Sequence, residues 1–337
     1  MAKIKDNTVQ VVFISLLLDL LAFTMILPLL PALLDYYKEI ENDQSMYFKI
    51  LHYIQNTRKF FYAPDKVSTV LYGGFLGSMY SFLQFLGSPI VGALSDIYGR
   101  KPLMMFCLIG ITMSYLLWAL SFNFTIFVLA RFVGGISKGN VSLSMAIISD
   151  VTSPKTRGKA MALVGIAFSI GFVVGPMIGA FFAWISSNNR EGACMQQGWM
   201  FLGIGLVMAI LQGSWVRTIP SNKTKSAVEL GLWLTVPAFV CVGLATDILM
   251  LSIGLLLFAI STAMVVTCMM TLVTRIGPDY QKGTITGVFR SLGALARACG
   301  PIVASIAFWC IGSKTTYLIG AVLLIFPPVI LQRIKLP

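Results

Sequence analysis

Five charged side chains lie inside long apolar stretches of this sequence. One is acidic, Asp19, and four are basic: Arg131, Lys138, Arg290 and Arg297. Ionisable groups are costly within lipid, so a charge at that depth usually binds an ion or relays protons. Because the bases outnumber the acid, the set favours an anion as the bound species. The carboxyl group is a candidate for taking up and releasing a proton.

Structural roles for the same residues remain open. Asp19 would then only neutralise a neighbouring cation, and Arg290 would extend its head group to the membrane surface. At a rise of ~1.5 Å per residue, Lys138 lies closer to Asp19 in depth than Arg131 does. Depth therefore favours Lys138 as the partner of the acid, and the residues alone do not decide between the two bases.

The elements that carry these charges are membrane-spanning helices. The chain is 57% hydrophobic and 11% charged, with a mean hydropathy of +0.84, whereas soluble domains contain about 25% charged residues. Apolar runs of roughly 20 residues cross the hydrocarbon core, and each must be helical to satisfy its own backbone. We predict an all-α integral membrane protein with about ten spans: residues 11–33, 68–92, 102–121, 124–149, 159–186, 198–216, 229–246, 248–274, 283–311 and 315–332.

Basic residues set the expected orientation. The net charge of +12 comes from residues scattered over short alternate loops, a pattern typical of cytoplasmic loops, which places both termini in the cytoplasm. It does not indicate nucleic-acid binding. One histidine and six cysteines without metal-ligand spacing favour neither a metal nor a cofactor, and no catalytic set can be assembled, so we expect no enzyme.

A charged loop with regular glycines lies at residues 92–102. Asp96 and Arg100 are four residues apart and can pair, and a carboxylate there can cap a neighbouring helix N-terminus. Gly92 and Gly99 stand on either side of the acid. Asp96 is therefore expected to act in conformation and not in substrate binding.

An internal repeat relates the segment at 157–176 to the segment at 282–301. Gly175-Pro176 and Gly300-Pro301 are separated by the same interval as Arg157-Gly158 and Lys282-Gly283. This repeat predicts two pseudo-repeated bundles of five helices, residues 1–186 and 198–337, joined by a short junction at 187–197.

Four segments together resemble the major facilitator superfamily, of the drug:proton antiporter type. They are the loop at 92–102, the first span with Asp19 before a Pro-x-x-Pro, the Arg131 segment with its paired glycines, and the glycine-rich fifth span. The pairing of residues 136–144 with 290–298 further resembles an animal subfamily related to tetracycline exporters. The resemblance implies the major facilitator fold, in which related helices are six spans apart. They are four apart here, so helices six and seven are expected to be missing at the junction.

The resemblance also assigns roles. It implies proton coupling by Asp19 and Arg131 and a conformational latch in the 92–102 loop. The excess of positive charge assigns substrate binding to the remaining three bases, Lys138, Arg290 and Arg297. The resemblance also implies an antiporter hinge built from small residues and prolines that form a tight seam between the halves: Gly171, Gly175, Pro176, Gly179, Gly300 and Pro301.

The expected function is proton-coupled efflux or exchange of organic anions or drug-like compounds by alternating access. The partners would be the lipid bilayer, a small organic anion and protons, in the plasma membrane or an internal membrane. A shortened form that does not transport and modulates the full-length transporter is the first alternative, and a lipid scramblase or channel is a weaker one. The oligomeric state is not assigned.

Overall fold

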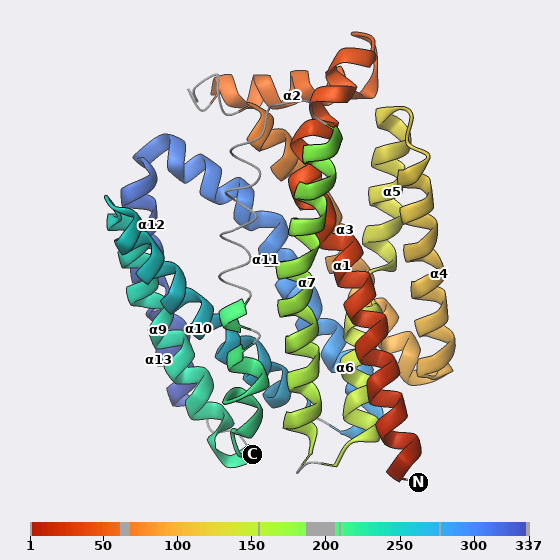
Figure 1. Cartoon of the computed structure of the whole chain (residues 1–337), viewed down its shortest axis with the longest axis vertical. Helices are drawn as coiled ribbons and strands as arrows, with labels where there is room; N and C mark the ends of the chain where they lie inside the picture. The colour runs from red at the N-terminus through yellow and green to blue at the C-terminus, as the bar shows by residue number, and fades with distance from the viewer. Residues whose placement is uncertain are drawn as a thin grey trace. The chain divides into compact units, whose positions relative to one another are not determined.

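The computed structural model describes residues 2–60, 68–153, 156–186, 206–208, 210–275 and 278–334, and its regular structure in these ranges is entirely helical (Figure 1). The main helices are α1 (Ala2–Ile40), α2 (Met46–Phe60), α3 (Ser68–Tyr98), α4 (Arg100–Ala119), α5 (Phe124–Ser137), α6 (Asn140–Val151), α7 (Arg157–Ser186), α9 (Thr224–Leu244), α10 (Ile248–Val273), α11 (Lys282–Ile311), α12 (Ser313–Leu323) and α13 (Phe326–Arg333).

Eight helical segments within the described residues are long and apolar enough to cross a membrane. Each coincides with one of the predicted spans. The predicted span at 68–92 lies in α3, which is not among the eight. Residues 198–205 and 209 of the predicted span at 198–216 fall outside the described residues, as does the junction at 187–197. The all-helical membrane architecture expected from the apolar runs is therefore confirmed.

The helices form two compact units, each described by itself. One unit contains residues 1–29, 148–276 and 313–337, and the other contains residues 30–147 and 277–312. Within the first, α9 packs against α10 and α12, and α10 contacts α7; within the second, α3 packs against α11 and α5, and α5 against α4. Each unit draws on both predicted bundles, whose limits at 186 and 198 remain a prediction.

An aromatic core closes one end of the second unit. Tyr37, Phe124 and Phe127 are fully buried there. The Tyr37 hydroxyl donates to the Ser121 carbonyl at 2.8 Å, and a Glu41 oxygen accepts from the Phe124 amide at 2.8 Å. These contacts fix the start of α5, on which Arg131 is carried.

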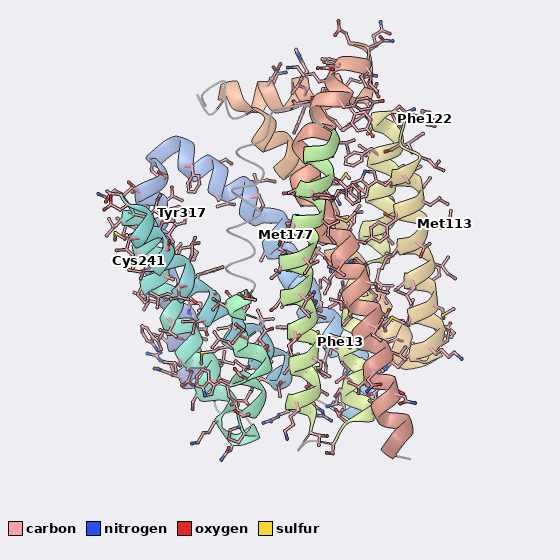
Figure 2. All side chains as sticks on the ribbon, viewed as in Figure 1. Phe13, Met113, Phe122, Met177, Cys241 and Tyr317 are labelled. Atoms are coloured by element: carbon pink, nitrogen blue, oxygen red, sulfur yellow. The ribbon has the colours of Figure 1, made fainter. Side chains whose placement is uncertain are left out.

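The outer surface of α4 is apolar, as a helix facing lipid should be. Met113 is 47% exposed, and Phe122, just beyond the helix, is 72% exposed (Figure 2). Apolar side chains on such a surface are in their preferred medium within a bilayer, although they would be unfavourable in water.

Two details of secondary structure were not predicted. Part of the segment at 35–67, which lies between the first two predicted spans, forms the end of α1 and the whole of α2. The fourth span, expected as one helix over 124–149, is divided into α5 and α6, with Lys138 and Gly139 between them. A Cβ at position 139 would lie 2.6 Å from Cγ1 of Val91, so α3 approaches the backbone closely where the helix breaks.

Candidate functional site

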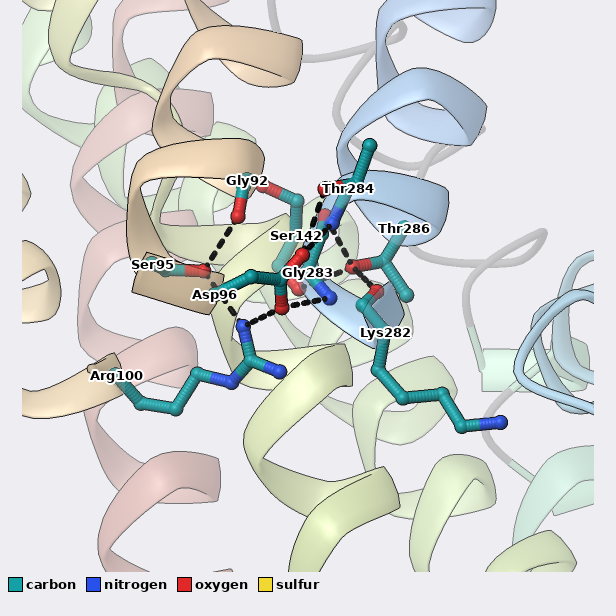
Figure 3. Close-up of polar contacts among 9 residues, drawn as sticks. All are labelled: Gly92, Ser95, Asp96, Arg100, Ser142, Lys282, Gly283, Thr284 and Thr286. Carbon is teal, nitrogen blue, oxygen red and sulfur yellow. Dashed lines mark hydrogen bonds and ion pairs between the residues drawn. The ribbon is translucent and has the colours of Figure 1, made fainter. Parts of the chain in front are cut away.

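Asp96, near the end of α3, caps the N-terminus of α11 within the second unit (Figure 3). Its Oδ1 accepts from the Gly283 amide at 2.9 Å, and its Oδ2 accepts from the Thr284 amide at 2.7 Å and the Thr284 hydroxyl at 2.6 Å. The first amides of a helix have no partner within the helix, and they attract a negative charge. The sequence predicted such a cap but did not identify the capped helix.

Arg100 completes the polar cluster around Asp96. Its Nη1 donates to Asp96 Oδ1 at 2.6 Å and to the Ser95 hydroxyl at 2.7 Å. The Ser95 hydroxyl in turn donates to the Gly92 carbonyl at 2.7 Å. Gly99, the residue before α4, has a φ of 90°, a conformation that favours glycine. The turn thus brings Arg100 back onto Asp96.

Hydrogen bonding stabilises the ionised form of Asp96. Burial of the carboxyl group on its own raises its pKa, but hydrogen bonds from the Thr284 side chain and amide, from Arg100 and from the Gly283 amide outweigh burial. Together they hold the pKa of Asp96 below its ordinary value. The carboxylate is therefore charged at neutral pH, as a helix cap and partner of a guanidinium should be.

Glycines allow α3 and α11 to touch through their backbones. A Cβ on Gly92 would collide with the Gly283 carbonyl oxygen, and one on Gly287 would lie 2.6 Å from the Ser88 carbonyl oxygen. A Cβ on Gly283 would lie 2.5 Å from the Gly92 carbonyl oxygen. Larger residues at these positions would push the helices apart and stretch the hydrogen bonds to Asp96.

Arg131 is held in the second unit by aromatic rings. It is only 7% exposed, and its guanidinium carbon lies 5.0 Å from the ring centre of Tyr80 and 5.9 Å from that of Trp118. Its Nε has no hydrogen-bond partner among the described residues. Ring faces attract a cation, especially where water is excluded. Tyr80 of α3 and Trp118 of α4 therefore stabilise the positive charge of Arg131, which forms no ion pair with a carboxylate among the described residues.

The other bases are linked through a residue that sequence analysis missed. Lys138 is 4% exposed and lies at the break between α5 and α6. Gln84 of α3 donates its Nε2 to the Lys138 carbonyl at 3.4 Å and accepts at Oε1 from Arg297 Nη2 at 3.0 Å. Tyr80 also lies near Arg297, and the like charges of Arg297 and Arg290 repel each other. We call Arg131, Lys138, Arg290 and Arg297 the basic cluster.

Asp19 belongs to the first unit and is buried, at 6% exposure. The predicted partners Arg131 and Lys138 belong to the second unit. Proton coupling by Asp19 and Arg131 therefore remains a prediction.

The glycine-rich motif of α7 packs against α1. A Cβ on Gly171 would lie 2.8 Å from the Leu20 Cβ, and one on Gly175 would collide with the Thr24 hydroxyl. That hydroxyl donates to the Gly171 carbonyl at 2.6 Å. Pro176 lies inside the helix and does not end it. The tight contact seen at these glycines is with a helix of the same predicted bundle.

The repeat-related positions in α11 have a different environment. Gly175 and Gly179 are buried, whereas Gly300 and Pro301 are exposed. A Cβ on Gly300 would meet nothing within 4 Å. The small residues of α7 are therefore required for packing, and Gly300 of α11 is not.

Comparison with known proteins identifies the family. Residues 12–229 match the family model of the Major Facilitator Superfamily. Human Major facilitator superfamily domain-containing protein 10 is 35% identical to the chain, over 98% of it and 94% of the relative. The class B tetracycline resistance protein of Escherichia coli is 28% identical over 67% of the chain and 48% of that protein.

Solved structures agree with this assignment. The crystal structure of the human organic anion transporter MFSD10 (TETRAN) superposes with a TM-score of 0.90 at 34% identity, covering 97% of the chain and 99% of the solved one. The proton:xylose symporter XylE superposes with a TM-score of 0.73 at 11% identity, over 100% and 96%, which shows a shared fold. With helices that match membrane spans and a family model covering more than half of its length, this chain belongs to the major facilitator superfamily, a family of multi-pass membrane transporters and not of enzymes.

Proposed function

We propose that this protein moves organic anions across a membrane in exchange for protons, by alternating access. The observation that carries the proposal is the basic cluster. Arg131 lies in α5, Lys138 lies between α5 and α6, and Arg290 and Arg297 lie in α11. The rings of Tyr80 and Trp118 contact Arg131. Gln84 hydrogen-bonds to the Lys138 carbonyl and to Arg297.

The cluster has few acidic neighbours along its own helices. Helices α4, α5 and α11 contain no Asp or Glu. The only acid of α3 is Asp96, which is committed to the α11 cap, and the only acid of α6 is Asp150, which is exposed near the end of that helix. A cation at membrane depth costs free energy unless an opposite charge or polar group compensates it. An anionic substrate would supply that compensation, which agrees with the description of the human relative as an organic anion transporter.

Asp19 is the proposed proton carrier. It is a buried acid in α1, and it stands in the first predicted span. Protonation would remove the charge of Asp19, and release of that proton would restore it. We propose both termini to be cytoplasmic, as the basic loops indicate.

The test is uptake of naphthalene-2-sulfonate into proteoliposomes with an imposed pH gradient. Wild-type protein should move the anion in response to the gradient, and a protonophore should abolish the response. Arg297→Gln should lower the rate at least about tenfold, the equivalent of roughly 1.4 kcal/mol. Arg275→Gln, which removes a base just after α10, is the matched control and should have no effect.

Two results would contradict this proposal. Transport that is indifferent to the sign of the substrate charge would remove the role of the basic cluster. Transport that persists unchanged with the protonophore present would remove proton coupling and favour a channel or scramblase.

A second candidate function is supported by the contrast between Gly175 and Gly300. Gly175 is covered by α1, but Gly300 is open, as expected if the counterpart of α1 in the second half is missing. The alignment with the human relative extends over 428 residues, whereas the chain has 337. We propose that a form shortened at helices six and seven would transport poorly and modulate a full-length transporter.

This second candidate has its own test. Co-expression with a full-length relative should give co-purification and lower anion uptake by the relative. Robust uptake by the 337-residue protein alone would contradict it. Restoring two spans at the junction should raise uptake if the missing helices are required.

A further inference from the structure

Gln84 is the only amide side chain of α3, and it lies between two bases of the cluster. It is 5% exposed, so water does not satisfy its amide group. Its nitrogen donates to the Lys138 carbonyl at 3.4 Å, and its oxygen accepts from Arg297 at 3.0 Å. Each end of the amide therefore has one protein partner.

The chemistry of the partners fixes the orientation of this amide. A backbone carbonyl can only accept a hydrogen bond, and a guanidinium can only donate. An amide supplies a donor and an acceptor at its two ends, whereas a carboxylate supplies acceptors only. At this position a carboxylate would repel the Lys138 carbonyl and cancel the charge of Arg297.

The carbonyl of Lys138 needs a donor because the fourth span is broken there. Helix α5 ends at Ser137 and α6 begins at Asn140. A backbone carbonyl that accepts no hydrogen bond is unfavourable at membrane depth, because no water is present there to donate one. Gln84 therefore joins the break to Arg297 on α11.

We propose that Gln84 is the positioning residue that sets the charge preference of the basic cluster. It holds the Arg297 guanidinium through a neutral hydrogen bond, so the positive charge stays available to an anion. The inference rests on the proposed function and adds a residue that determines its specificity. Gln84 acts through Arg297 and the Lys138 carbonyl, not by contact with the substrate.

The test replaces the amide by a group whose charge depends on pH. In Gln84→Glu, the ionised side chain should pair with Arg297 and weaken anion binding at least tenfold at pH 8. A protonated carboxyl group again offers one donor and one acceptor, as the amide does. Pairing with Arg297 favours the ionised form of the new glutamate, whose ordinary pKa is about 4.3. Binding should therefore recover only as the pH is lowered below about 4, a recovery that wild-type protein does not show.

Binding is measured on the purified full chain with naphthalene-2-sulfonate and a naphthyl quaternary ammonium ion of similar size. The wild type should prefer the sulfonate, and Gln84→Glu should lose that preference at pH 8. Gln84→Met, similar in length but unable to form either bond, should weaken sulfonate binding severalfold at every pH. Gln44→Glu adds the same charge at an exposed site and should behave as the wild type.

The possible results separate the hypotheses. Sulfonate binding by Gln84→Glu equal to the wild type at pH 8, or equally weak at every pH, would overturn the inference. If Gln84→Glu does not fold, unchanged binding by Gln84→Met would overturn it as well. Absence of sulfonate preference in the wild type would instead contradict the proposed function, and the inference with it.

Discussion

Replacement of Asp96 by Asn should release the N-terminus of α11. The carboxylate accepts four hydrogen bonds, two at each oxygen, from Gly283, Thr284 and Arg100. In the variant one oxygen becomes an NH₂ group that faces donors, so two of the four bonds are lost. Hydrogen bonds to charged groups contribute about 1.5–3 kcal/mol each. Because the site is partly open to solvent, we expect a total loss of about 2 kcal/mol from the α3–α11 contact.

Amide hydrogen exchange measures this loss directly. The amides of Gly283 and Thr284 are hydrogen-bonded to Asp96, so their exchange should accelerate about 30-fold in Asp96→Asn, the equivalent of 2 kcal/mol. Asp247→Asn is the matched control because Asp247 precedes α10 without a side-chain hydrogen bond to it. Unchanged exchange in Asp96→Asn, or equal acceleration in both variants, would refute the assignment of Asp96 as the cap.

The same contact predicts a pH dependence. The pKa of Asp96 is lowered from an ordinary value of 3.8, so its stabilising effect is complete above about pH 4 and is lost as the pH falls through the lowered pKa. The difference in unfolding temperature between wild type and Asp96→Asn should be constant from pH 8 to 5 and shrink below pH 4. A difference that grows with acidification would have the wrong sign for this mechanism.

The remaining predictions concern packing in the two units. Gly175→Leu should destabilise the protein by about 1–3 kcal/mol through overpacking against α1, and Gly300→Leu should be nearly neutral because its surroundings are open; thermal unfolding in detergent compares the pair, and equal effects would contradict the contrast. Tyr80→Leu should cost about 1–2 kcal/mol by removing the ring beside Arg131, whereas Tyr80→Phe should retain most of the stability, also by thermal unfolding. Thr284→Val keeps the hydrogen bond from the backbone amide to Asp96 but loses the one from the hydroxyl. Hydrogen exchange at the start of α11 should therefore show a loss of about 1 kcal/mol, smaller than the loss in Asp96→Asn.

The sequence was sufficient for eight of the ten predicted spans and for the chemistry of the charged loop. Long apolar runs leave the backbone no alternative to a helix in lipid, and Asp96 with Arg100 four residues later predicted both a pair and a cap. The identity of the capped helix depends on tertiary packing, because Gly283 and Thr284 are far away along the chain. No periodicity within α3 encodes that contact.

Other features could not be derived in the same way. The break before α6 falls in the polar run Ser137-Lys138-Gly139-Asn140. Polar residues also occur in continuous membrane helices that face the protein interior, so this run did not by itself predict a break. A Cβ at position 139 would collide with Val91 of α3, and that close approach depends on tertiary packing. Gln84 carries no signal in the sequence, because a single amide in an apolar helix can have many structural roles. Its partners, the Lys138 carbonyl and Arg297, are far away along the chain and meet it only through tertiary packing.

The backbone contact between α3 and α11 has a consequence for how these helices separate. Gly92, Gly283 and Gly287 bring the two backbones into direct contact and have no side chains of their own that could extend across a widening gap. Dispersion attraction falls steeply within an ångström of separation, and the hydrogen bonds to Asp96 fail over a similar distance. Partial opening therefore loses nearly all of the stabilisation at once. The contact should therefore be either closed or open, with no stable partly opened state. Its opening should follow single-exponential kinetics between these two populations.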